Sequence, residues 1–99
     1  MNTTPATIKK RLSPLLKRHG VKRAALFGSI VHNRLTKNSD IDLLIEFRGQ
    51  KSLFDLVDLE LALEDLLKRK VDLVTYRSLH PLLRDRILKE QAVIYGKKS

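Results

Sequence analysis

The sequence contains no cysteine and no tryptophan, and it has only three phenylalanines and two tyrosines among its 99 residues. Without cysteine the chain has no disulfide, zinc ribbon or thiol nucleophile, and we expect an intracellular, cytoplasmic protein. The shortage of aromatic rings disfavours binding to single-stranded nucleic acid, which relies on stacking platforms. No run of about 18 apolar residues occurs. We therefore expect no transmembrane helix and, from the polar N-terminus, no signal peptide.

Acidic residues are also missing from residues 1–39, which carry nine lysines and arginines. Eight of the eleven acids fall within 40–65, and the formal net charge is +9. Such segregation indicates a polyanionic ligand or an acidic protein surface near the basic segment, although a solvated surface accounts for it equally well. Direct binding of nucleic acid is favoured by charge alone and is not expected. The length and the 42% hydrophobic content predict a single domain over 1–99 with one modest core.

Helix and strand signals alternate along the chain. Apolar periodicity predicts helices over 5–20, 53–67 and 79–91, and Pro14 is expected to kink the first or to start a second short helix. Short β-rich apolar runs predict strands over 23–27, 41–47 and 71–76, with 93–95 packing afterwards. This order predicts a small α/β fold around one sheet. The wide leucine face of 53–67 either covers the sheet or leaves an exposed stripe for a partner chain.

Three aspartates interrupt the apolar strand patterns. Asp40 and Asp42 are two residues apart, so a strand directs both side chains to one face, and Asp72 lies between Val71 and Leu73 in another strand pattern. A single such Asp is usually a turn or cap residue. Three carboxylates brought together repel one another, and a hard cation such as Mg²⁺ relieves that repulsion. The aspartates therefore favour a metal site. Sites that hold two metal ions are typical of enzymes that catalyse phosphoryl transfer.

Gly28-Ser29 lies where a predicted strand turns into a short helix. Glycine at such a turn lets the backbone approach a ligand closely, and the free N–H groups of the helix start can bind phosphate. The Ser29 hydroxyl adds a donor. Because Gly-Ser is also a common turn pair, its weight comes from the spacing: ten residues separate Ser29 from Asp40.

The pattern of Gly28-Ser29, ten residues and Asp40-Ile41-Asp42 resembles the signature of the DNA-polymerase-β-like nucleotidyltransferase superfamily. Residues 27–47, FGSIVHNRLTKNSDIDLLIEF, resemble its small minimal nucleotidyltransferase (MNT) group, and the likeness extends over 22–95. The resemblance implies a nucleotidyltransferase fold of α/β (α+β) class, with a small mixed sheet flanked by helices. It also implies transfer of a nucleoside monophosphate from a nucleoside triphosphate, usually ATP, with release of pyrophosphate.

The resemblance also assigns roles to individual residues. It implies that Gly28 and Ser29 bind the triphosphate, and that Asp40 and Asp42 hold two Mg²⁺ ions and, through them, the nucleotide. Asp72 is implied to be the third catalytic carboxylate, which holds the catalytic metal ion and helps to remove the proton from the attacking hydroxyl.

The chain departs from the family pattern at one place. Relatives usually have Arg-Gly where this chain has His32-Asn33. Asn tolerates a left-handed backbone, so the turn is expected to survive. The missing arginine is expected to weaken triphosphate binding unless Arg34 or Lys37 substitutes.

Other candidate residues are interpreted as structural. His32 is interpreted as a surface histidine, and residues 68–70 (Lys-Arg-Lys) as a solvated turn rather than a phosphate-binding group. Tyr76 and Tyr95 are expected to pack rather than to stack on a nucleotide.

The MNT group also implies a partner. The chain resembles the MNT antitoxins of HEPN/MNT toxin–antitoxin pairs, so we expect a Mg²⁺-dependent protein adenylyltransferase that transfers AMP to a tyrosine of a HEPN ribonuclease toxin, within a hetero-oligomer. The alternative is a catalytically weak antitoxin that masks its toxin by binding. Transfer to a small molecule such as an aminoglycoside is ranked below both, because a polycation is repelled by a chain of charge +9.

Overall fold

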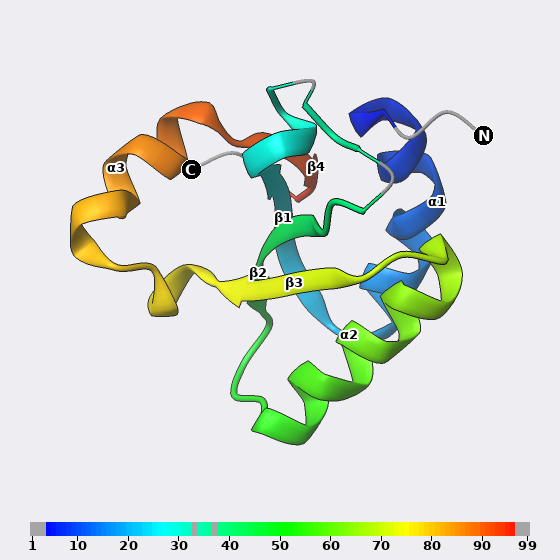
Figure 1. Ribbon diagram of the computed structural model, residues 1–99. Coiled ribbons are helices and arrows are strands. Elements are labelled where there is room, and N and C mark those ends of the chain that lie inside the picture. The colour runs from blue at the N-terminus through cyan, green and yellow to red at the C-terminus, as the bar shows by residue number, and fades with distance from the viewer. Residues whose placement is uncertain (1–3, 33, 37, 97–99) are drawn as a thin grey trace.

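The computed structural model describes residues 4–32, 34–36 and 38–96, in which a four-stranded sheet carries helices on both faces (Figure 1). The strands are β1 (Val21–Phe27), β2 (Ile41–Phe47), β3 (Val71–Thr75) and β4 (Ala92–Tyr95). They lie in the order β3-β2-β1-β4, with β1 antiparallel to both its neighbours and β2 parallel to β3. The sheet is therefore mixed, as the family resemblance implies.

The helices follow the predicted order. They are α1 (Pro5–Arg18), the short 3-10 helix η1 (Gly28–Ile30), α2 (Leu53–Leu67), the 3-10 helix η2 (Tyr76–Ser78) and α3 (Pro81–Glu90). α1 runs unbroken through Pro14, so no second short helix starts there. None of the helices in the described part of the chain is long and apolar enough to cross a membrane.

Local sequence signals fix the helix starts. The Thr4 side chain accepts a hydrogen bond from the Thr7 backbone N–H at the start of α1, where Pro5 occupies the first turn. Ser52 and Asp55 form a reciprocal capping box at the start of α2. These signals explain why both helices begin where the sequence predicts.

The structure corrects three strand boundaries. β1 begins at Val21 rather than at residue 23, and Tyr76 belongs to η2 rather than to β3. Residues 92–95 form a strand, β4, which pairs with β1 through Ala25 and Val93, whereas the sequence suggested packing alone. The hydrogen-bond partners of β4 come from a segment about 70 positions earlier, so no local pattern predicts them.

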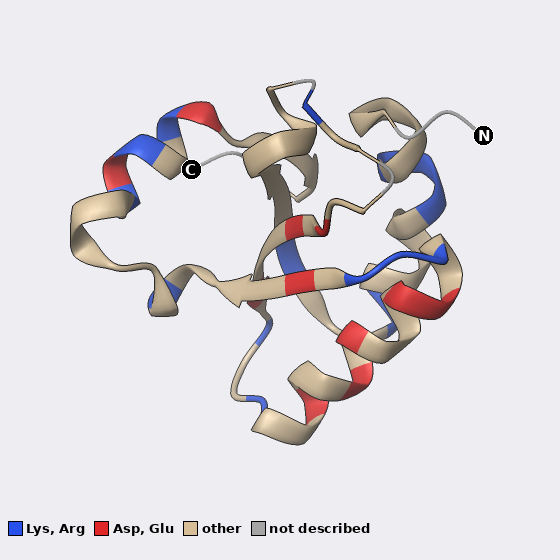
Figure 2. Ribbon diagram, in the orientation of Figure 1, with Lys and Arg blue, Asp and Glu red and all other residues tan. Residues whose placement is uncertain are grey.

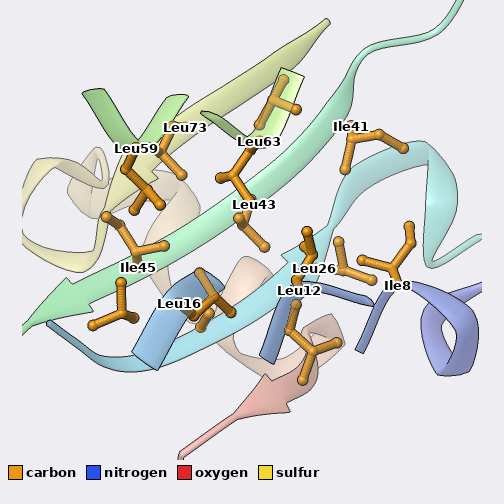
Figure 3. Packing of buried hydrophobic residues seen from close by; sticks show 14 of the residues in the cluster. Ile8, Leu12, Leu16, Leu26, Ile41, Leu43, Ile45, Leu59, Leu63 and Leu73 are labelled. Carbon is orange, nitrogen blue, oxygen red and sulfur yellow. The ribbon is translucent and has the colours of Figure 1, made fainter. Parts of the chain in front are cut away.

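The main apolar cluster lies between the sheet and the helices α1 and α2 (Figure 3). Ile41, Leu43 and Ile45 of β2 point into it and are fully buried. The alternate residues of β2 point to the opposite face, where Leu44 joins a smaller cluster with Ala25, on which side chains of η2 and α3 pack. Asp42 shares this second face with Leu44, because the two residues are two positions apart.

α2 both covers the sheet and leaves apolar side chains exposed. One part of its apolar surface is therefore a cover for the sheet, and another part is an exposed stripe. Leu59 and Leu63 are fully buried. The opposite side of the helix exposes large apolar side chains at four positions: Leu53, Phe54, Val57 and Leu61.

Candidate active site

The register of the sheet brings two of the predicted aspartates together. Asp42 of β2 pairs with Asp72 of the parallel strand β3 and, on its other side, with Phe27 at the end of β1. Residues in register on adjacent strands point to the same face, so the two carboxylates lie side by side. In Figure 2, acidic segments of β2 and β3 lie next to each other.

Asp40 lies outside the strand, because β2 begins at Ile41. The expectation that Asp40 and Asp42 both stand on a strand is therefore corrected at this residue. Asp40 nevertheless remains close enough to Asp42 for its charge to raise the pKa of that carboxyl. Asp40 and Asp72 are exposed, whereas Asp42 is half-buried.

The pKa of Asp42 is raised to about 6 from the usual 3.8. Desolvation by burial is the largest cause, followed by the charges of Asp72 and Asp40 and a hydrogen bond with Asp72. The ion pairs found among the described residues all involve other acids. Among the described residues, negative charge is therefore concentrated at this edge of the sheet, and none of their lysines or arginines forms an ion pair with Asp40, Asp42 or Asp72.

The donor set suits a hard divalent cation, but the carboxylates alone do not enclose one. Within residues 4–32, 34–36 and 38–96, no three His, Cys, Asp or Glu side chains are grouped so as to hold an ion by themselves. Mg²⁺ prefers oxygen ligands and is usually bound by one or two carboxylates together with substrate phosphates and water. The paired Asp42 and Asp72 fit that mode, in which phosphate oxygens complete the coordination.

Gly28 makes room for Asp42. It begins η1 with φ +75°, a conformation that favours glycine, and a Cβ added there would overlap the Asp42 carboxylate. The sequence suggested that this glycine lets the backbone approach a ligand. The structure shows that the side chain packed against it is the Asp42 carboxylate itself.

A cavity of about 340 Å³ lies beside this turn, between η1 and α3. Gly28 and Ser29 line it from one side and Leu83 and Ile87 of α3 from another. Its charged and polar lining residues are His32, Arg34, Arg86 and Glu90. The turn is closed by a hydrogen bond from the Arg34 backbone N–H to the Ser29 carbonyl, at 2.8 Å. Gly28 and Ser29 thus border both the acidic edge and a cavity that contains two arginines.

Arg69 holds the loop that carries Asp40, which the sequence did not predict. Its Nη1 donates to the carbonyl oxygens of Thr36 and Ser39 at 2.9 and 2.8 Å. The backbone N–H of Ile41 donates to the Lys70 carbonyl at 2.9 Å, so the same turn also anchors the start of β2. The interpretation of 68–70 as a merely solvated turn is therefore wrong for Arg69. No periodicity marks such a long-range contact.

The remaining sequence candidates have mixed outcomes. His32 is exposed, as expected, but its Nε2 lies 3.0 Å from Glu90 Oε2. Tyr76 is buried beneath the Arg23 guanidinium, whose carbon lies 4.0 Å from the ring centre, so it packs as expected. Asn33 and Lys37 lie outside the described residues.

Comparison with known proteins gives the family. Residues 10–99 match the family model described as "Polymerase beta, Nucleotidyltransferase". A relative from Methanocaldococcus jannaschii, provisionally named a protein adenylyltransferase, is 54% identical over 83 residues, or 84% of this chain and 89% of the relative. Protein adenylyltransferase MntA of Thermococcus cleftensis is 38% identical over 82% of this chain and 80% of the relative. The chain therefore belongs to the polymerase-β nucleotidyltransferase family.

Solved structures agree with this assignment. One that is provisionally described as a minimal nucleotidyltransferase is 36% identical and has a TM-score of 0.78, over 91% of this chain and 95% of that chain. A toxin–antitoxin crystal structure with AMP-PNP has a TM-score of 0.79 at 24% identity, over 91% and 74%. A tri-AMPylated Shewanella oneidensis HEPN toxin in complex with its MNT antitoxin gives 0.73 at 21%, over 96% and 75%. The last two show the common fold alone.

The raised pKa of Asp42 predicts that Asp42→Asn does not destabilise the metal-free protein. The folded state holds the Asp42 proton up to about pH 6, whereas an unfolded aspartate loses it near 3.8, so ionisation of Asp42 lowers stability as pH rises through this window. The free energy of unfolding of Asp42→Asn, measured by urea titration in EDTA at pH 7.5, is expected to equal or exceed that of the wild type. In this variant, the free energy of unfolding also loses the part of its pH dependence that comes from Asp42, between the pKa values of 3.8 and about 6. Asp85→Asn, at an exposed acid of α3, is the control, and a clearly less stable Asp42→Asn would contradict the prediction.

Loss of the Arg69 contacts is expected to loosen the loop before Asp40. Arg69→Gln should lower the free energy of unfolding by about 1–2 kcal/mol, because two charged hydrogen bonds to carbonyls are removed. It should also speed hydrogen exchange at the Thr36 and Ser39 amides, which are hydrogen-bonded in this loop. Lys70→Gln, at an exposed neighbour, should leave both unchanged. Equal exchange rates in the two variants would show that Arg69 does not hold the loop.

Proposed function

We propose that this nucleotidyltransferase transfers AMP from ATP to a hydroxyl of a partner protein, a HEPN-type toxin, and thereby acts as its antitoxin. The observation that carries the proposal is the in-register pair Asp42 and Asp72, placed beside the Gly28-Ser29 turn. The names of the relatives supply the acceptor class, because they describe protein adenylyltransferases. A tyrosine of the toxin is the proposed acceptor residue.

The positions of the side chains support the following residue roles. Gly28 and Ser29 bind the triphosphate at the mouth of the cavity. Asp40 and Asp42 would hold two Mg²⁺ ions, and Asp72 would help to hold the catalytic ion and would accept the proton of the acceptor hydroxyl. When bound, Mg²⁺ neutralises the carboxylates and stabilises charge on the reacting phosphate.

The proposed reaction needs no covalent intermediate on this chain. The acceptor oxygen attacks the α-phosphorus of ATP, a new O–P bond forms, and the bond from the α-phosphorus to the bridging oxygen of the β-phosphate breaks. The hydroxyl proton passes to the Asp72 carboxylate and then to water, and pyrophosphate leaves. Positioning and charge stabilisation dominate such phosphoryl-type transfers, which suits a site built from carboxylates and a phosphate-binding turn.

A protein acceptor fits the form of this site. Asp40 and Asp72 are exposed at the edge of the sheet, so the attacking hydroxyl can be delivered by another molecule. The exposed apolar residues of α2 offer a surface for such a partner, and Leu53 and Phe54 have exposed fractions of 73% and 82%. An assembly of the two proteins would orient the acceptor and bury this surface together.

A stoichiometric antitoxin that masks its toxin is the second candidate. The exposed apolar side of α2 favours it, because binding through that surface does not require catalysis. The two candidates differ in one observable, which is covalent modification of the toxin.

Intact-mass spectrometry tests the proposal. The chain is incubated with ATP, Mg²⁺ and a candidate HEPN-type partner, and the toxin is expected to gain the mass of one or more AMP units. Asp42→Asn should lower the rate on the order of a hundredfold or more, because it removes a metal ligand. Asp85→Asn should retain the wild-type rate.

Two results would contradict parts of the proposal. Full activity of a folded Asp42→Asn protein would overturn the metal-site assignment. A stable complex with no change in toxin mass would replace enzymatic transfer with masking.

A further inference from the structure

The cavity beside Gly28-Ser29 contains a charge arrangement that the family pattern does not explain. Arg34 follows the turn on one side, and Arg86 reaches the cavity from α3 on the other. Glu90, one turn further along α3, is the acid among the lining residues. Arg34, Arg86 and Glu90 together give the lining a formal net charge of +1. The neighbouring aspartates, by contrast, are negatively charged.

Glu90 connects the two walls of the cavity. Its Oε2 lies 3.0 Å from Nε2 of His32, on the segment that follows η1, and its Oε1 lies 3.7 Å from Nε of Arg86. His32 is itself tied to the turn, because its backbone N–H donates to the Gly28 carbonyl at 3.3 Å. A continuous set of contacts therefore runs from Gly28 through His32 and Glu90 to Arg86.

The Arg86–Glu90 contact is easily exchanged for another anion. The Arg86 side chain is 75% exposed, and an exposed ion pair at 3.7 Å contributes little to stability. A phosphate group presents more negative charge than one carboxylate, and it accepts paired hydrogen bonds from a guanidinium. Arg86 can therefore turn from Glu90 to a phosphate in the cavity at small cost.

We propose that Arg86 is a phosphate-binding residue for the nucleoside triphosphate, which it reaches from α3 across the cavity from Gly28-Ser29. The inference rests on the proposed function, since it takes the triphosphate to lie on Gly28-Ser29. Glu90 holds Arg86 at the cavity before the nucleotide binds, and His32 holds Glu90.

Equilibrium binding of ATP to the full-length chain tests this inference. In isothermal titration calorimetry with Mg²⁺, Arg86→Gln is expected to bind ATP about tenfold to a hundredfold more weakly than the wild type, because a charge-assisted contact to phosphate is lost. The affinity for adenosine, which has no phosphate, should not change. Arg86→Lys should fall between the two proteins, because it keeps the charge but loses the paired donors.

Lys89→Gln is the matched control. Lys89 is an exposed cation of the same helix that does not line this cavity, so its loss changes the net charge equally without removing the proposed contact. This variant should bind ATP within about twofold of the wild type, as expected for a charge change away from the site. Circular dichroism confirms that each variant is folded.

The possible outcomes separate the inference from the function on which it rests. A wild-type chain that binds no ATP would overturn both. Wild-type binding with equal affinities for Arg86→Gln and Lys89→Gln would overturn the role of Arg86 and leave the proposed function standing. Equal weakening for ATP and adenosine would show that Arg86 supports the fold of the cavity rather than a phosphate.

Discussion

The contact between the Asp42 carboxylate and the backbone of Gly28 is the constraint on which the rest of the site depends. It brings the end of β1 against β2 so closely that a side chain at position 28 would overlap Asp42. The same closeness desolvates Asp42 beside Asp72, which raises the pKa of the Asp42 carboxyl. The Gly28 turn and the negatively charged aspartates are therefore parts of one local arrangement, which is the one that the proposed function uses.

The packing of the apolar core fixes the register of β2 and thereby the position of the Asp42 carboxylate. Ile41, Leu43 and Ile45 are fully buried against α1 and α2, so the alternate residues of the strand must face the other way. A slip of one residue would expose that apolar row and bury Asp42 in the core. Core packing therefore fixes the position of Asp42. The repulsion between the Asp42 carboxylate and its acidic neighbours lowers the stability of the fold, and the packing of the core offsets this loss.

Local sequence patterns predicted the features that depend on neighbouring residues, such as helix bounds and the spacing of the motif. The bounds of α2 follow from its apolar periodicity and its capping box, and the spacing from Gly28 to Asp42 was sufficient to locate the candidate site. The strand β4, the Arg69 contacts and the cavity against α3 were not predicted, because each joins segments distant in sequence. The same-face argument treated Asp40 as a strand residue, although the predicted strand, like β2, begins at Ile41.

In the proposed function, the distribution of charge would separate binding of the nucleotide from binding of the acceptor. The acids Asp42 and Asp72 lie in register on adjacent strands, and two arginines, Arg34 and Arg86, line the cavity beside the Gly28-Ser29 turn. Under the proposed function, a triphosphate that spans the turn would meet guanidinium groups at one end and the carboxylates at the other, so charge would set its orientation before any acceptor arrives. Because the exposed Asp72 lies at the acidic end, the acceptor hydroxyl has an open approach there. On this proposal the chain orients the nucleotide, and the surface of the partner orients the acceptor.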